Sequence, residues 1–326
     1  YLLKIKLQSG RDFISSPYHR VLVWSNGKII NKKTVELNKN DKFFIPKKLD
    51  VHDNDIKEID ILSEFLKFGD LPEDIVVRGV KKLVRKCIEQ LGGLKNTSQR
   101  IGLNKKTFSN YIYRNSIPYV ILLKLLQLCN RNINSIPREA LIGVKRGHTV
   151  IPRVIKIDEP FMRLIGYYLS EGHTRCTKKN CYQISFACTE KETHDDIIQC
   201  IKHVFSIYPS ETKKDICVSN RIIHILFVDI LNIGRNAKTK RIPTQFIALP
   251  KHKIRELLRA YFAGDGSVEK NRLHVTCSSV NRDLLRDIGF QLLRFGIFYR
   301  LREEHKKAGG AAKKFYDKKG ASPVFT

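Results

Sequence analysis

The stretch Arg163-Leu-Ile-Gly-Tyr-Tyr-Leu-Ser-Glu-Gly172 decides the fold, because its pattern returns as Leu258-Arg-Ala-Tyr-Phe-Ala-Gly-Asp-Gly266. In each copy two small residues four positions apart are followed by an acid and then by a glycine. The acids are Glu171 and Asp265. A match at every small and acidic position indicates an internal repeat rather than two unrelated buried helices.

The small residues predict how the two copies pack. Gly166 and Ser170 in the first copy, and Ala260 and Gly264 in the second, are spaced so that each pair lies on one helix face. Two helices with such faces can bring their backbones very close together. We therefore expect the helices to pack side by side near the centre of the chain.

Each helix is expected to end at its acid. Gly172 and Gly266 suit the left-handed residue that ends many helices, which places Glu171 and Asp265 in the last turns. Two carboxylates at the negative ends of two helix dipoles repel each other unless a cation intervenes. Acids that hold metal ions against a phosphodiester are typical of two-metal hydrolysis. The pattern thus predicts that both acids are catalytic and bind metal.

The composition indicates the class of partner. The 326 residues carry a formal net charge of +28, which favours a polyanion and above all nucleic acid. No apolar run is long enough for a membrane span. Eight cysteines without a Cys-x-x-Cys pair or a secretory signal indicate the reduced thiols of a cytoplasmic protein. A zinc corner of His173, Cys176 and Cys181 is disfavoured, because no second pair follows it.

On these residues the chain resembles the LAGLIDADG homing endonucleases, specifically the two-motif kind found in archaeal inteins. The resemblance implies an α+β fold with two pseudo-symmetric αββαββα subdomains, related by an axis through the motif helices of one monomer. It also implies site-specific hydrolysis of both strands of a long double-stranded DNA target. The metal ion would be Mg²⁺, with Mn²⁺ as an alternative.

We expect four parts along the chain: a partial splicing-type β domain at 1–48, a helical region at 49–150, and two subdomains at 151–247 and 248–326. Short alternating bursts before residue 48 predict strands. Ser16-Pro-Tyr-His19 resembles the Thr-x-x-His region of an intein splicing domain. The chain begins at Tyr1 rather than Cys or Ser and lacks a final His-Asn pair, so we expect no splicing chemistry there.

The helical region contains a predicted helix-turn-helix. Leu94–Leu103 and Asn104–Tyr113 form two helical patterns, with Gly102 in the turn and Asn104 as an N-cap. A helical hairpin with a solvated basic face is the alternative. Residues 145–149 are expected to link this region to the nuclease half. The side chains expected to contact phosphates and base edges in a major groove are Lys105, Lys106, Ser109, Asn110 and Tyr113.

The resemblance also implies that the two repeats form sheets that lie on the DNA as a curved saddle. Alternation at Tyr182, Ile184 and Phe186 predicts a strand, and a second strand pair is expected at Ile216–Val218 and Ile222–Ile225. The amphipathic stretches 189–205 and 280–295 predict helices. The polar strand positions expected to contact the duplex are Arg175, Gln183, Ser185, Arg272, His274 and Thr276.

A further basic residue comes from the resemblance. Asn236-Ala-Lys-Thr-Lys-Arg-Ile-Pro243 resembles the family's Lys-x-Ile-Pro block, where a basic residue lies near the scissile phosphate. Lys240 matches that position and would stabilise charge on the phosphate or polarise the attacking water. A surface lysine that neutralises a phosphate is the alternative.

The C-terminal sequence is compatible with more than one function. Residues 306–314, rich in Lys, Ala and Gly, depart from the family pattern, so the second subdomain is either complete or truncated. A truncated subdomain favours a DNA-binding protein that has lost cleavage. A protein-splicing remnant and an RNA maturase built on the same scaffold are two further possibilities.

Overall fold

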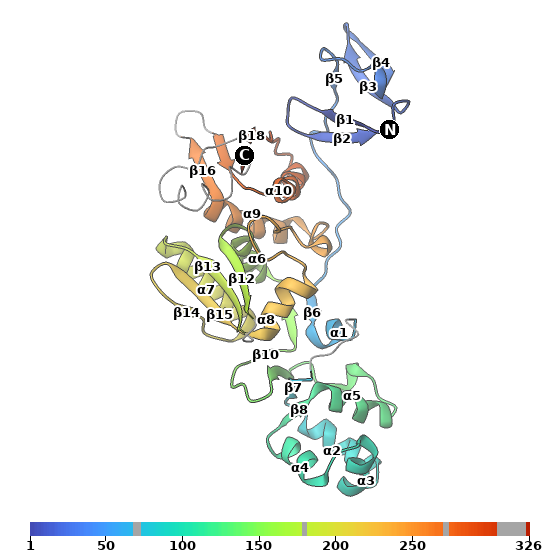
Figure 1. Cartoon of the computed structure of the whole chain (residues 1–326), viewed down its shortest axis with the longest axis vertical. Coiled ribbons are helices and arrows are strands. Elements are labelled where there is room, and N and C mark those ends of the chain that lie inside the picture. The colour runs from blue at the N-terminus through green and yellow to red at the C-terminus, as the bar shows by residue number, and fades with distance from the viewer. Residues whose placement is uncertain (68–72, 178–180, 270–273, 305–323) are drawn as a thin grey trace. The chain divides into compact units, whose positions relative to one another are not determined.

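The computed structural model describes residues 1–67, 73–177, 181–269, 274–304 and 324–326. It has the expected α+β class, with helices and several small antiparallel sheets (Figure 1). By their contacts the residues form two compact units. Unit 1 comprises residues 1–54, 237–254 and 265–326, and unit 2 comprises residues 55–236 and 255–264. The division into four domains predicted from the sequence stays a prediction.

Residues 1–48 form strands, as their alternating pattern predicts. A hairpin of β1 and β2 precedes a three-stranded sheet in which β3 lies between β4 and β5. Asn26 and Gly27 have φ of 50° and 77°, which suits the tight turn between β3 and β4. The strands are β1 (Leu3–Lys6), β2 (Asp12–Ser15), β3 (Arg20–Ser25), β4 (Lys28–Lys33) and β5 (Lys42–Phe43).

The β1–β2 turn packs tightly against the C-terminal part of unit 1. Leu301 N donates to the Ser9 carbonyl at 2.8 Å. Arg282 and Arg286, from the helix α10 (Arg282–Arg294), form ion pairs with Asp12. A Cβ on Gly10 would lie 1.5 Å from the Leu301 carbonyl oxygen, and the φ of Gly10 is +78°. Only glycine fits this position.

Gly10→Ala is expected to lower the free energy of unfolding by at least about 3 kcal/mol, because a backbone clash adds to the cost of positive φ. Gly27→Ala is the matched control: its φ is +77° and nothing lies within 4 Å, so it should cost only about 1 kcal/mol. Urea titrations followed by the fluorescence of Trp24, the chain's single tryptophan, measure both. Equal costs for the two variants would show that the β1–β2 turn does not dock on Leu301.

Side-chain contacts fix both ends of α10 in unit 1. Asn281 caps this helix, accepting from Asp283 N and Leu284 N. Arg294 near its end is fully buried and donates to the Ile247 and Leu249 carbonyls and to Asp53. The other elements are η4 (Thr244–Phe246), β16 (Gly266–Glu269), β17 (His274–Cys277), β18 (Glu303–Glu304) and β19 (Val324–Phe325).

Unit 2 begins with a mostly helical part built on a four-stranded sheet in the order β10-β9-β7-β8. Residues 145–149, expected to be a linker, instead form the turn of the β9–β10 hairpin, where Arg78 donates to the Gly147 carbonyl. The elements are β6 (Glu58–Asp60), α1 (Ile61–Phe65), β7 (Ile75–Arg78), α2 (Lys81–Gln90), α3 (Leu94–Ile101), α4 (Lys105–Tyr113), β8 (Ser116–Pro118), α5 (Tyr119–Leu128), η2 (Ile133–Ser135), β9 (Leu141–Val144), β10 (Val150–Pro152) and β11 (Val154–Lys156).

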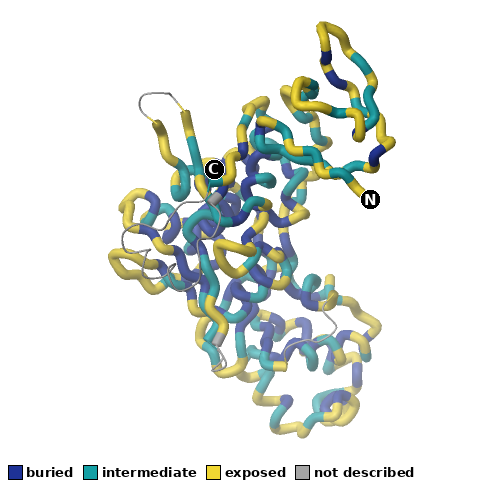
Figure 2. The backbone as a smooth tube through the Cα atoms, turned by 45° about the horizontal axis from the view of Figure 1, so that its top comes forward, coloured by how far each residue is buried: buried dark blue, intermediate teal, exposed yellow. Residues whose placement is uncertain are grey.

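The first repeat forms the second part of unit 2. Its helix α6 leads into a sheet of order β12-β13-β15-β14, with α7 and α8 packed against α6 and β13. The backbone of α6 is mostly buried (Figure 2). The elements are α6 (Glu159–Glu171), β12 (Gly172–Thr177), β13 (Cys181–Ala187), α7 (Lys191–Phe205), β14 (Ser210–Glu211), β15 (Asp215–Ser219), α8 (Arg221–Ile225) and the π-helical turn η3 (Leu226–Ile230).

The strand expected at Ile222–Ile225 is wrong, because these residues belong to α8. The Asn220 side chain accepts from Ile222 N and Ile223 N and so starts a helix. Ile222 and Ile223 are buried under the sheet, so tertiary packing outweighs the strand preference of β-branched residues.

His224 of α8 is buried without a hydrogen-bond partner for either ring nitrogen among the described residues. Its ring packs edge-on against Tyr182, with 5.4 Å between ring centroids. Burial lowers the pKa of His224 below its ordinary value. The folded protein therefore favours the neutral imidazole at neutral pH.

Acidification should destabilise unit 2 through His224. Below about pH 6.5 the unfolded chain binds a proton that the folded chain resists, so this stability is present at higher pH and is lost as the pH falls. His224→Phe is expected to flatten the dependence of the melting temperature on pH between about 7.5 and 5.5. The exposed His148→Phe serves as the control and should keep the full dependence. An unchanged slope in His224→Phe would refute this role.

Candidate active site

The start of helix α6 is defined by local signals. Asp158 caps it by accepting from Phe161 N, and Pro160 lies in the first turn, where a missing N–H costs nothing. Its apolar residues, including Leu164 and Ile165, are buried. The helix ends at Glu171, the acid of the first motif.

The predicted contact between the motif helices is confirmed by residues 257–264 of α9 (Lys251–Asp265). A Cβ on Gly166 would lie 2.3 Å from the Leu257 carbonyl oxygen and 2.8 Å from the Ala260 Cβ. A Cβ on Gly264 would lie 2.3 Å from the Ser170 Oγ. The two backbones therefore touch at the small residues of the repeat.

The same contact reaches the first acid. The Cβ position of Gly264 lies 3.1 Å from the Glu171 Cγ, and Asp265 is the next and last residue of α9. Burial raises the pKa of the nearby Cys188 thiol, and the negative charge of Glu171 raises it further. Glu171 itself is partly buried beside the helix contact.

The glycines after the acids differ from expectation. Gly172 has φ −78° and ψ 153°, so it starts β12 in an extended conformation instead of ending α6 in a left-handed one. Gly266 starts β16 and is likewise absent from the positive-φ residues of the described chain. A Cβ on Gly172 would lie 2.4 Å from the Tyr168 Cδ2, so close packing requires this glycine.

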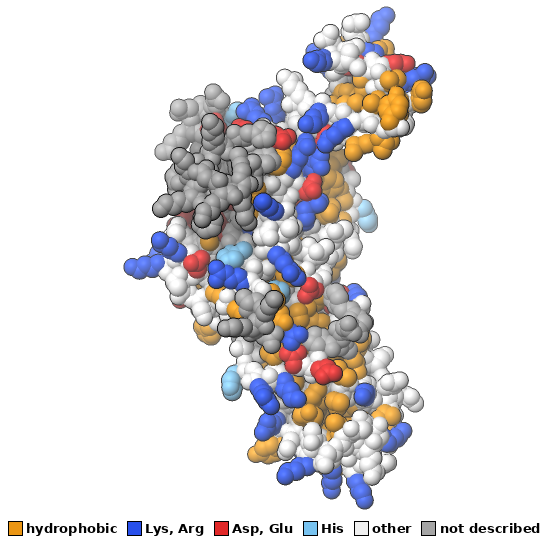
Figure 3. Space-filling model, viewed as in Figure 1, with side chains coloured by type: hydrophobic (Ala, Val, Ile, Leu, Met, Phe, Trp, Pro, Cys, Tyr) orange, Lys and Arg blue, Asp and Glu red, His pale blue; other side chains and the backbone are white. Residues whose placement is uncertain are grey.

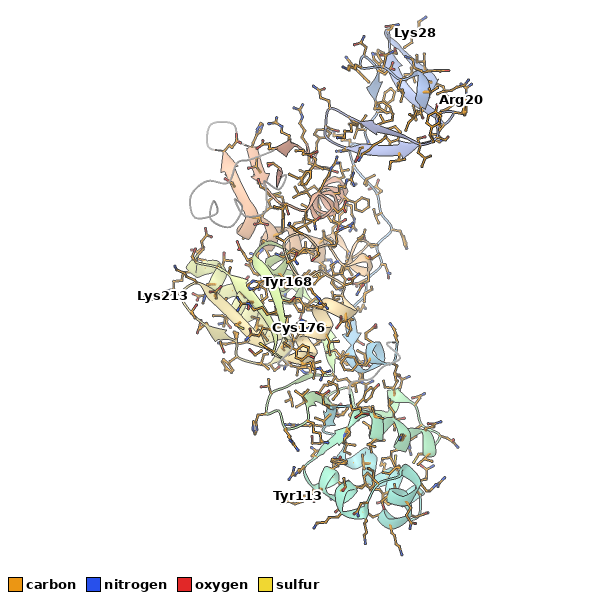
Figure 4. The ribbon with its side chains drawn as sticks, viewed as in Figure 1. Arg20, Lys28, Tyr113, Tyr168, Cys176 and Lys213 are labelled. Atoms are coloured by element: carbon orange, nitrogen blue, oxygen red, sulfur yellow. The ribbon has the colours of Figure 1, made fainter. Side chains whose placement is uncertain are left out.

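The side chain of Tyr168 fills the space next to Gly172. Its ring is fully buried between Phe186 and Phe227, at centroid distances of 6.2 and 5.1 Å, and its hydroxyl donates to the Gly234 carbonyl at 2.7 Å. This packing fixes the end of α6, and with it the start of the strand that follows Glu171. Figure 4 labels Tyr168, a residue of α6.

The donor set of the two acids suits a magnesium ion. Among the described residues no group of three or more His, Cys, Asp or Glu side chains is placed to hold a metal by itself. Mg²⁺ commonly takes only one or two carboxylates from the protein and completes its shell with phosphate oxygens and water. The two motif acids match that number of carboxylates, and their role as metal ligands stays a prediction.

Lys240 is buried in unit 1, with 3% of its surface exposed. Its main-chain carbonyl accepts from the Asn281 side chain at 2.7 Å, which ties it to the start of α10. The alternative of a surface lysine is therefore wrong. The catalytic role of Lys240 stays a prediction.

The outer face of the first sheet gathers the polar residues predicted for DNA contact in this copy. Arg175 pairs with Gln183, and Gln183 pairs with Ser219 and donates to its hydroxyl at 3.1 Å. Ser185 lies on the same face but is 8% exposed, which limits its access to a ligand. The pairing register adds three residues of this face that sequence reasoning missed, because they are found only by knowing the strand partners: His173, Cys217 and Ser219.

In the second copy, β16 and β17 form a two-stranded ribbon. His274 pairs with Glu269 and is exposed, and Thr276 pairs with Ser267. Arg272 lies outside the described residues.

The predicted pair of helices in the helical region is present as α3 and α4. Gly102 ends α3 with φ +76°, and Asn104 caps α4 by accepting from Lys106 N at 2.8 Å. Phe108 is fully buried. All five residues predicted to contact a groove are exposed, and Tyr113 lies at the edge of this part (Figure 4) with 82% exposure.

Sequence reasoning missed further basic side chains in the same helical part. Lys82, Arg85 and Lys86 on α2 and Arg114 after α4 are exposed. Lys and Arg side chains are prominent around the helical part (Figure 3). Their helical spacing around the buried Leu83 and Val84 was the available signal.

No helix among the described residues is long and apolar enough to cross a membrane.

Comparison with known proteins finds a family model that matches the second copy of the repeat. Residues 252–316 match the model of the LAGLIDADG-like domain. The chain is 34% identical over 304 residues to the DNA polymerase II large subunit of Thermococcus kodakarensis, covering 91% of this chain and 16% of that protein. It is 26% identical over 301 residues to the DNA-directed RNA polymerase subunit Rpo1C of Methanocaldococcus jannaschii, covering 91% and 27%.

A solved structure of I-DmoI in complex with DNA and Mn aligns at 12% identity and a TM-score of 0.34, over 52% of this chain and 89% of that chain. Among the sequence relatives, the chain spans about a sixth of the polymerase subunit and about a quarter of Rpo1C.

Proposed function

We propose, from the LAGLIDADG-like domain that this chain contains, that it is a site-specific homing endonuclease that cuts both strands of a long DNA target. The observation that carries the proposal is the direct backbone contact between the two motif helices, each of which ends at an acid. Glu171 and Asp265 are proposed to share the metal site. The expected convergence of their carboxylates is part of the proposal.

The relatives support an insertion that carries its own nuclease. Nearly the whole chain matches a minor part of a DNA polymerase subunit and of an RNA polymerase subunit. A segment common to proteins of different function is expected for a mobile element such as an intein. The strands at 1–48 would then belong to a splicing-type domain.

The chemistry proposed for the site uses few residues. A bound Mg²⁺ would act as a Lewis acid toward the phosphodiester and would activate water. Glu171 and Asp265 would bind that ion in a fixed position, because each acid is the last residue of a helix. Lys240 would offset negative charge developing on the phosphate. The nucleophile would be water.

Cleavage of a library of random duplexes tests this function. The unmodified chain should cut a single family of sites on both strands when Mg²⁺ is present and none when EDTA is added. Sequencing of the cut ends gives the target. Cleavage that ignores EDTA would contradict the metal-dependent proposal.

One observation favours a second candidate, a DNA-binding protein without cleavage. The first copy has one four-stranded sheet, whereas the described residues of the second copy form two separate two-stranded sheets, β16-β17 and β18-β19. Val268 and Val275, paired in the β16-β17 ribbon, are 65% and 61% exposed. An uncovered apolar pair of this kind is expected of an incomplete subdomain. Tight binding of one site with no cleavage would support this candidate.

Helix α4 is proposed to position the duplex without taking part in the chemistry. Lys105→Ala and Lys106→Ala should each weaken DNA binding and lower the dependence of log Kd on log salt by about 1, because each removes a phosphate contact. Asn110→Ala should weaken specific binding only. Turnover of saturating substrate should persist in all three.

Lys124→Ala is the control, since Lys124 is exposed on α5 of the same helical part. Filter-binding titrations over a range of salt concentrations give the slopes. A loss of turnover at unchanged affinity would show that α4 does not serve as the positioning helix.

A further inference from the structure

Arg163 of α6 joins three helices about two turns before Glu171. Its guanidinium forms a bidentate pair with Asp196 of α7, with Nε–Oδ2 and Nη2–Oδ1 distances of 2.9 and 3.0 Å. Its Nη1 lies 3.8 Å from the Oε2 of Glu256 on α9. One side chain therefore connects the first motif helix both to α7 and to the second motif helix.

Asp196 and Glu256, the two acids that pair with Arg163, each have a further partner. The Tyr167 hydroxyl donates to Asp196 Oδ2 at 2.8 Å, and Arg259 Nη2 lies 3.0 Å from Glu256 Oε2. The Glu256 side chain is only 8% exposed. We call Arg163, Tyr167, Asp196, Glu256 and Arg259 the helix clasp.

The clasp carries its charges in a partly buried place. Burial raises the pKa of Asp196, but the hydrogen bonds from Arg163 and Tyr167 outweigh burial and hold that pKa below its ordinary value. The Asp196 carboxylate is therefore ionised at neutral pH. A buried ion pair adds little to the free energy of folding compared with apolar packing at the same place. A gain in stability is therefore a weak explanation for the presence of these charged residues.

The repeat does not account for the clasp. When Glu171 is aligned with Asp265, Arg163 falls opposite Leu257, and Glu256 falls opposite Met162. Each charged residue thus has an apolar counterpart in the other copy. The helices could pack through apolar residues at these positions, and the pair between Arg163 and Glu256 has no symmetric counterpart in the repeat.

We propose that the helix clasp is a positioning device, which fixes the axial register of α9 residues 255–264 against α6 and thereby the spacing of the two motif acids. Contacts between small residues are not directional, whereas a bidentate guanidinium–carboxylate pair is. A slip of one residue would move a carboxylate by about 1.5 Å along the helix, which exceeds the tolerance of Mg²⁺ for its near-ideal octahedral geometry. The inference rests on the proposed function, because it concerns the same acids.

Arg163→Met and Glu256→Gln test the clasp, with Lys67→Met as the matched control. Lys67 forms an exposed pair with Glu64 in the same unit, so its replacement also removes one positive charge. Binding of Mn²⁺ to the complex with DNA is measured by the loss of the free-ion EPR signal, and the melting temperature is measured in parallel. Binding that survives in Asp265→Asn is subtracted as nonspecific.

Mn²⁺ affinity should fall about 10- to 100-fold in both clasp variants and stay unchanged in Lys67→Met, as expected for residues that orient metal ligands. Arg163→Lys should remain weakened, because an ammonium group cannot form the bidentate pair. A lowered melting temperature with unchanged Mn²⁺ affinity would make the clasp merely structural and would overturn the inference.

Two further outcomes have separate meanings. If Arg163→Met does not fold, Glu256→Gln and Tyr167→Phe decide the question by the same criterion, since Tyr167→Phe removes one hydrogen bond and no charge. If Asp265→Asn binds as much Mn²⁺ as the unmodified chain, the proposed metal site itself is wrong, and the clasp inference falls with it. If Asp265→Asn loses Mn²⁺ binding but the clasp variants bind Mn²⁺ as well as the unmodified chain, the clasp inference is wrong and the proposed metal site stands.

Discussion

Replacement of Glu171 by Gln or of Asp265 by Asn is expected to lower the rate of DNA cleavage by at least about a thousandfold, or roughly 4 kcal/mol of barrier. The double variant should be no worse than either single variant, because acids that share one metal site act as a unit. DNA binding should persist or tighten at low Mg²⁺, since each change removes a negative charge that faces the phosphates. Single-turnover cleavage and filter binding measure the two effects separately.

Glu190→Gln is the control for this experiment. Glu190 is exposed, and with Glu171 it contributes to the electrostatic environment of Cys188, but it lies outside both motifs. Its replacement removes one negative charge near the site and should leave cleavage intact. If Asp265→Asn cut as fast as the unmodified chain, the two-carboxylate mechanism would be wrong.

Gly166→Ala is expected to destabilise unit 2 by about 3 kcal/mol, against the usual trend. In a helix interior, alanine normally exceeds glycine in stability by about 1 kcal/mol. Here a Cβ would lie 2.3 Å from the Leu257 carbonyl oxygen, and the main chain of α9 cannot yield as a flexible side chain can. The sign of the change therefore reports whether the two helices touch.

Ala260→Gly, added to Gly166→Ala, supplies the control. It removes the Ala260 Cβ, which lies 2.8 Å from the new methyl group, and leaves the clash with Leu257 in place. The double variant should recover part of the loss expected from adding the two single changes. Urea unfolding gives the free energies, and a stabilising Gly166→Ala would contradict the observed helix contact.

The parts of the fold that the sequence predicts well are those with a strong local pattern. Small residues four apart predict the packing of α6 on α9, and alternation at Tyr182, Ile184 and Phe186 predicts β13. Asn104 is recognisable as a cap because its side chain precedes a helical pattern. In each case neighbouring residues carry the whole signal.

Features that depend on distant partners were missed or misjudged. Ile222–Ile225 have the composition of a strand, but the cap at Asn220 and burial under the sheet make them helical. Gly172 is required by the ring of Tyr168 and not by a left-handed turn. Nothing in the sequence indicates that Lys240 is buried.

The candidate site also contains residues that a local pattern predicts and residues that only the structure reveals. The motif acids follow from the repeat, whereas the link from Arg163 to Glu256 spans 93 positions and needs the packed helices to become visible. Gln183 was identified from its alternating strand, but its partner Ser219 follows only from the pairing register. The roles of these residues stay predictions.

The most direct test of the central claim is a crystal structure of the chain bound to its DNA target with Mn²⁺, recorded at a wavelength where manganese scatters anomalously. The account predicts anomalous peaks within about 2.5 Å of carboxylate oxygens from both Glu171 and Asp265, beside one scissile phosphate. Carboxylates on opposite surfaces, or ions bound away from both of them, would contradict it.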